Sequence, residues 1–103
     1  MIDRSLILLK QEMYSAKRAF HEAGGRYYAA RTTDSRSGAT REAARVYREA
    51  ARPYGRALDN CEEYYLSLDR SAKAESELQH IRTFKHSLGV ILGNLAMFYP
   101  EVS

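Results

Sequence analysis

The chain has a single cysteine, no tryptophan, two prolines and no long apolar run. One cysteine cannot form an internal disulfide, so we interpret Cys61 as a buried thiol in a reducing cytoplasm. The longest nearly unbroken apolar stretch, residues 88–99, is shorter than the ~18 residues that a helix needs to cross a bilayer. Only a short apolar segment, residues 6–9, lies near the N-terminus, and no cleavage-like site follows it, which argues against a secretory signal. The sequence therefore predicts a cytoplasmic protein without a membrane span.

Catalytic signatures are also missing from the sequence. It contains no Ser/His/Asp grouping, no phosphate-binding loop and no paired CxxC motif. Glu77 and His80 have the spacing of one half of a ferritin-like di-iron site, which needs a second such motif and two further carboxylates. A salt bridge is the simpler interpretation of this pair. We therefore expect a protein that is not an enzyme and has no cofactor and no metal site.

One pair of residues resembles a known enzyme family. Arg82 and His86 are similar to the Arg–His pair of the HEPN ribonucleases, with Thr83 at the polar position of that family. The family spaces the two residues farther apart than they are here. The resemblance implies a ribonuclease site at Arg82 and His86, so a HEPN-like or metal-dependent enzyme is the remote alternative.

What the sequence does have is an apolar repeat with alternating steps of four and three residues, which occurs in three stretches. Such steps return a side chain to one face of a helix every 3.5 residues. The first row comprises Ile2, Leu6, Leu9, Met13, Ala16, Phe20, Ala23, Tyr27 and Ala30. The second row comprises Ala43, Tyr47, Ala50, Tyr54, Ala57, Cys61, Tyr64 and Leu68. The third row comprises Ala74, Leu78, Ile81, Phe84, Leu88, Ile91 or Leu92, Leu95, and Phe98 or Tyr99.

The repeat predicts three helices at about residues 3–30, 40–69 and 71–99. Asp3, Thr40 and Ser71 are suitable N-cap residues for them. Gly24-Gly25 and Pro53 normally weaken or break helices, but the apolar rows pass through both sites in phase. We therefore expect bends at these sites and not helix ends.

The three helices have matched lengths of ~42–45 Å at 1.5 Å per residue. A tight turn at residues 69–71 makes the second and third helices antiparallel. The predicted fold class is all-α: an elongated antiparallel three-helix bundle (up-down-up) that forms a single domain over residues 1–103. It stands alone or assembles as a dimeric helical bundle.

The middle of the chain is strongly basic, because residues 26–56 hold eight arginines against three acidic residues. Five of these arginines fall within an arc of about 80° on the 40–69 helix, roughly opposite its apolar row. The members of this arginine stripe are Arg41, Arg45, Arg48, Arg52 and Arg56. The stripe suits an acidic partner helix or a phosphate backbone. The alternative is a solvated face that Glu42 and Glu49 partly neutralise.

Two further groups of residues suggest interaction surfaces. The pairs Tyr27-Tyr28 and Tyr64-Tyr65 place one ring in the core and one outside, so Tyr28 and Tyr65 are predicted partner-binding residues. The other apolar candidates stand off the predicted core faces and are predicted to mediate homodimerisation. They are Ile7, Leu8, Val90 and Met97.

These features together predict a small non-catalytic helical protein that binds a macromolecular partner. A protein partner is favoured, with the chain acting as an adaptor, inhibitor or antiactivator. The alternative is nucleic-acid binding through the arginine stripe, which salt and Arg→Ala changes would weaken steeply.

Overall fold

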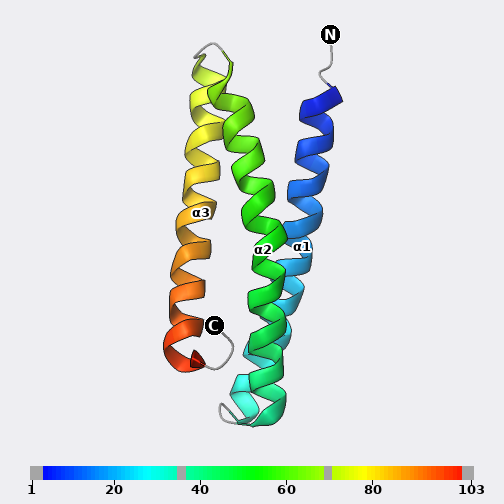
Figure 1. The fold of residues 1–103 in the computed structure, drawn as a ribbon, viewed down its shortest axis with the longest axis vertical. Helices are drawn as coiled ribbons and strands as arrows, with labels where there is room; N and C mark the ends of the chain where they lie inside the picture. The colour runs from blue at the N-terminus through cyan, green and yellow to red at the C-terminus, as the bar shows by residue number, and fades with distance from the viewer. Residues whose placement is uncertain (1–3, 35–36, 69–70, 101–103) are drawn as a thin grey trace.

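The computed structural model describes residues 4–34, 37–68 and 71–100, and they form three long helices. Helix α1 comprises Arg4–Thr33, α2 comprises Gly38–Leu66 and α3 comprises Ala72–Phe98. The described residues measure 51 × 21 × 19 Å, and each helix runs antiparallel to the one before it along the long axis (Figure 1). The predicted all-α three-helix bundle is therefore confirmed, whereas its assembly as a dimer stays a prediction.

Of the predicted N-cap residues, one is wrong and another is confirmed by the structure. Ser37 caps α2 by accepting a hydrogen bond from the backbone N–H of Thr40, so Thr40 is not the N-cap. Thr40 lies inside the helix, where it is buried and its hydroxyl donates to the carbonyl of Asp34. Ser71 caps α3 as predicted, by accepting from the N–H of Ala74. The predicted cap Asp3 lies outside the described residues, as does Ile2 of the first apolar row.

Neither of the expected weak points ends a helix. Helix α1 continues through Gly24 and Gly25, and α2 continues through Pro53. Their apolar rows bury enough surface to outweigh the local cost of about 1 kcal/mol per glycine and about 3 kcal/mol for proline.

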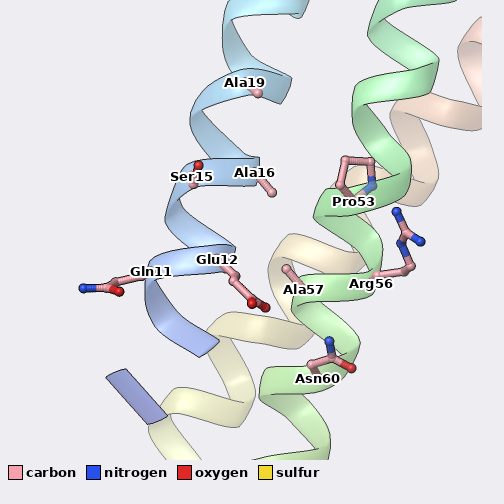
Figure 2. Close-up of a pocket in the computed structure, with 9 residues that line it drawn as sticks. All are labelled: Gln11, Glu12, Ser15, Ala16, Ala19, Pro53, Arg56, Ala57 and Asn60. Atoms are coloured by element: carbon pink, nitrogen blue, oxygen red, sulfur yellow. The ribbon is translucent and has the colours of Figure 1, made fainter. Parts of the chain in front are cut away.

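Helix α2 is the middle helix of the bundle. Helix α1 packs on α2 and α2 packs on α3, while the backbones of α1 and α3 stay apart throughout the described ranges. Small side chains let α1 and α2 approach, with Ala16 and Ala57 facing each other across their seam (Figure 2). Side chains bridge the wider gap between α1 and α3, where Lys17 Nζ lies 4.1 Å from the centroid of the Phe84 ring. The third side of the bundle is therefore closed by long side chains only.

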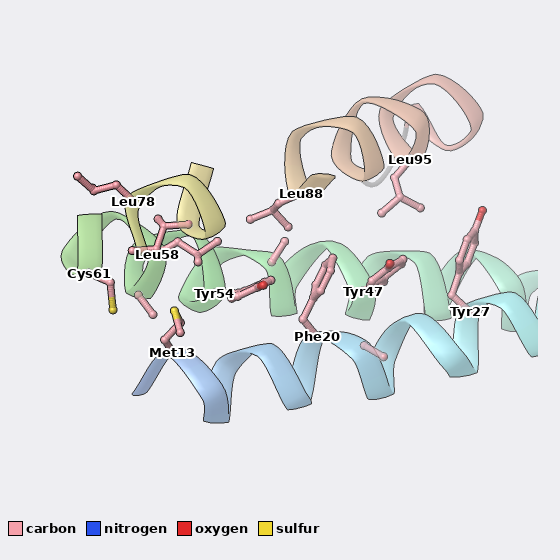
Figure 3. Close-up of a cluster of buried hydrophobic side chains, with 14 of the residues drawn as sticks. Met13, Phe20, Tyr27, Tyr47, Tyr54, Leu58, Cys61, Leu78, Leu88 and Leu95 are labelled. Carbon is pink, nitrogen blue, oxygen red and sulfur yellow. The ribbon is translucent and has the colours of Figure 1, made fainter. Parts of the chain in front are cut away.

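The types of side chain in the core differ between the two halves of the bundle (Figure 3). One half is aliphatic and sulfur-containing, with Met13, Leu58, Cys61 and Leu78 buried among the three helices. The other half is aromatic. Its rings stack closely, since the centroid of Phe20 lies 4.6 Å from that of Tyr47 and 5.4 Å from that of Tyr54.

Helix α2 also buries a row of residues that the apolar repeat did not include. Because α2 has a neighbour on each side, it buries a wider apolar surface than a single row provides. The members of this second row are Ala44, Ala51, Leu58 and Tyr65.

Candidate partner-binding surface

The arginine stripe lies on α2, on the side of the helix opposite its buried tyrosines. The side chains of Arg41, Arg45, Arg52 and Arg56 are exposed, and that of Arg48 is half-buried. The predicted placement of all five residues on one outward face is therefore correct. Their surroundings nevertheless differ along the helix.

Arg45 is neutralised by its own helix. Its guanidinium donates hydrogen bonds to both carboxylate oxygens of Glu42, and its Nη1 lies 2.6 Å from Oε1 of Glu49. The hydrogen bond from Arg45 lowers the pKa of Glu42 below its ordinary value, and the bonds to Glu42 and Glu49 raise the pKa of Arg45. For this arginine, the solvated and locally paired face is the correct interpretation.

Arg52 and Arg56 keep their charge uncompensated. Neither forms an ion pair with an acidic side chain in the part of the chain that the structure describes. The nearest acidic position farther along α2, Asp59, instead accepts Lys85 of α3, whose Nζ lies 2.8 Å from Asp59 Oδ1 and 2.9 Å from Glu62 Oε1. Two guanidinium groups therefore remain available to an anionic partner.

The two predicted tyrosine anchors have different positions. Tyr28 is 49% exposed, and its ring lies edge-on to the buried ring of Tyr47. Tyr65 is only 6% exposed, so the prediction that its ring is free for a partner is wrong. It belongs to the second buried row of α2, where a hydrogen bond with Tyr65 raises the pKa of Lys10. Tyr64, its predicted buried counterpart, is half-buried.

The four predicted self-association residues are all exposed. Ile7 and Leu8 are 41% and 59% exposed near the start of α1, and Val90 and Met97 are 50% and 73% exposed toward the end of α3. These two groups lie toward opposite ends of the bundle, because α1 and α3 run in the same direction (Figure 1). Phe98, Leu66 and Leu68 are also exposed and were not predicted to be. They lie at or next to helix ends, where the neighbouring helices do not cover the apolar side chains.

A groove between α1 and α2 was missed by the sequence analysis. It has a volume of about 700 Å³, and its floor is made of small side chains, namely Ala16, Ala19, Pro53 and Ala57. Glu12 points into the groove from α1, while Arg56 stands at the α2 edge and points away from α1 (Figure 2). Small residues carry little signal in an apolar pattern, so only the packing of the two helices reveals this surface.

The residues of the remote enzymatic alternatives, namely Glu77, His80, Arg82 and His86, all lie on α3. Within the described ranges, no three His, Cys, Asp or Glu side chains gather closely enough to hold a metal ion. His80 and His86 are exposed, and Arg82 lies 3.5 Å from Glu62 in an ion pair between α3 and α2. No described helix combines the length and apolarity that a membrane span requires.

No protein-family model, curated protein or solved structure matches this chain.

Proposed function

We propose that this chain is a small, non-catalytic cytoplasmic protein that binds another protein through the outer face of α2 and acts as an adaptor, inhibitor or antiactivator. The observation that carries the proposal is the pair Arg52 and Arg56, exposed on a rigid helix without an ion-pair partner in the described residues. Arginine is enriched at protein interfaces because its planar guanidinium binds carboxylates with two hydrogen bonds. Exposed Tyr28 adds an aromatic anchor farther along the bundle.

A protein partner is favoured over nucleic acid by the charges around the stripe. Arg45 is already paired, and exposed Glu42, Glu49, Asp59 and Glu63 share the outer side of α2. A phosphate backbone gains affinity from many uncompensated cations and is repelled by such carboxylates. A folded protein can instead present carboxylates to Arg52 and Arg56 and avoid the acidic positions.

We also propose that the chain forms a homodimer through its exposed apolar residues. Val90 and Met97 lie on a stretch of α3, residues 86–100, that contains no Asp, Glu, Lys or Arg. An uncharged helix face with exposed large side chains favours self-association over permanent contact with water.

The test of partner binding is affinity capture from a native lysate of the source organism, with and without nuclease treatment. We expect one protein to be retained in both conditions. If retention disappears after nuclease treatment, the nucleic-acid alternative replaces the proposal. If nothing is retained in either condition, a binding role of the arginine stripe is contradicted.

A further inference from the structure

The groove between α1 and α2 continues toward the end of α2. A second hollow is lined by Leu9, Glu63, Tyr64 and Ser67, and Asn60 lines both hollows. From Pro53 to Ser67 the groove follows the last 14 residues of α2 and the C-cap residue, which corresponds to ~21 Å at 1.5 Å per residue. It is open to solvent along this length and has an apolar floor with polar edges. A cleft of this form is open along one side and is long enough for an extended element.

The shape of the groove suits an α-helix of about four turns. Helices pack with their axes 8–10 Å apart, and the shorter separations require small side chains at the contact. Ala16, Ala19 and Ala57 meet that requirement, because none of them projects beyond its first carbon. Half-buried Leu9 and Tyr64 provide a larger apolar surface at the other end of the groove. A helix in this position would be the fourth helix of the bundle.

The two edges of the first hollow carry opposite charges, whereas Glu63 places a carboxylate on the α2 side of the second hollow. Glu12 extends into the groove from α1, and no ion-pair partner of Glu12 lies among the described residues. Arg56 stands at the α2 edge and is likewise uncompensated. A helix that lies between them meets a carboxylate on its α1 side and a guanidinium on its α2 side. Charge complementarity therefore requires basic residues on one flank of the helix and acidic residues on the other.

We propose that this groove binds an amphipathic α-helix of the partner protein, with a small or apolar face toward Ala16, Ala19 and Ala57, basic residues facing Glu12 and acidic residues facing Arg56. This inference rests on the proposed protein-binding function and names the chemistry of the segment that is bound. A second copy of α3 does not fit the description, because its exposed apolar half, residues 86–100, has no charged side chain for either edge.

The test is selection from a displayed library of 18-residue helical peptides with an alanine/leucine face and randomised flanks. We expect enriched peptides to carry Lys or Arg on one flank and Asp or Glu on the other. The exposed position Ala19 allows a blocking variant, Ala19→Trp, that fills the groove without entering the core. Ala29→Trp, at another exposed position of α1, is the matched control. Enriched peptides should bind Ala19→Trp at least about tenfold more weakly than Ala29→Trp.

A charge exchange provides the second arm, with Glu12→Lys and Arg56→Glu combined in one protein. Selection against this variant should enrich peptides with the two flanks reversed. Equal peptide binding by the two tryptophan variants, or unchanged flanks after the exchange, would overturn the inference. Circular dichroism confirms that each variant is folded before selection. The groove inference can fail while the proposed function stands: if captured protein is lost on Arg52→Gln but kept by Ala19→Trp, the function stands and the groove inference falls.

Discussion

The backbone of Gly24 in α1 lies directly against the ring of Tyr47 in α2. A Cβ atom at position 24 would stand 2.9 Å from Tyr47 Cζ and 3.0 Å from its hydroxyl oxygen. The ring cannot easily give way, because it is buried and its centroid lies 4.6 Å from that of Phe20 and 5.7 Å from that of Tyr27. Glycine at this position therefore permits the close approach of α1 and α2 in the aromatic half of the core.

Alanine substitutions at the two adjacent glycines should change the free energy of unfolding in opposite directions. Gly24→Ala should lower the free energy of unfolding by about 1–3 kcal/mol, because overpacking against Tyr47 exceeds the gain in helix propensity. Gly25→Ala should raise it by about 0.5–1 kcal/mol, because a Cβ there meets nothing within 4 Å. Urea unfolding of both variants measures the difference. Changes of the same sign would contradict the packing of Tyr47 on Gly24.

The buried tyrosines should make the bundle sensitive to alkaline pH. Burial raises the pKa of Tyr27 and of Tyr47 to about 12, from an ordinary value of 10. Because the folded state holds these protons more tightly, their contribution to stability is complete below pH 10 and is lost as pH rises toward 12. Tyrosinate absorbance during titration should show Tyr27 and Tyr47 ionising only as pH approaches 12, together with loss of the helical signal. Ionisation of both rings near pH 10 while the helical signal stays intact would contradict the aromatic core.

The thiol of Cys61 should react only when the protein unfolds. It is 1% exposed, its Sγ donates a hydrogen bond to the carbonyl of Leu9, and burial raises its pKa. A thiol-specific disulfide reagent should therefore modify native protein slowly and urea-unfolded protein at once. Ser15→Cys adds a thiol at an exposed position and serves as the control that reacts in the native state. Rapid modification of native Cys61 would contradict its burial.

Self-association should depend on the uncharged end of α3. Sedimentation velocity should find a dimer whose population falls sharply in the double variant Val90→Glu/Met97→Glu, because charge on an apolar contact is strongly unfavourable. Ser76→Glu, at an exposed position in the charged half of α3, should leave the dimer unchanged. A wild-type protein that stays monomeric across the accessible concentrations would contradict the proposed homodimer.

Much of the core could be predicted from the sequence, because apolar residues with a period of 3.5 lie on one face of a helix and that face is buried. Met13, Phe20 and Tyr27 are buried as their row predicts. Tyr65 was predicted to be exposed because the apolar row passes through its neighbour Tyr64, but it is buried and forms a hydrogen bond with Lys10 of α1. Which helix lies in the middle, and so buries a wider apolar surface, is decided only by tertiary packing.

The candidate surface could be predicted in outline but not in its charge balance. Spacing places Arg45, Arg52 and Arg56 on one face, yet it does not reveal that, of these three, Arg45 alone forms ion pairs with described residues. Asp59 lies on that face too, but Lys85 reaches it from another helix. The groove above Ala16 and Ala57 depends on small side chains from two helices, so neither helix predicts it alone.

We propose above that Arg52 and Arg56 of α2 bind a protein partner. The most direct measurement is the affinity of the nuclease-resistant captured partner for the double variant Arg52→Gln/Arg56→Gln, with Arg45→Gln as the matched control. We predict at least about tenfold weaker binding by the double variant and little change for Arg45→Gln, because Arg45 is already engaged by Glu42 and Glu49. Undiminished binding by the double variant would contradict the claim.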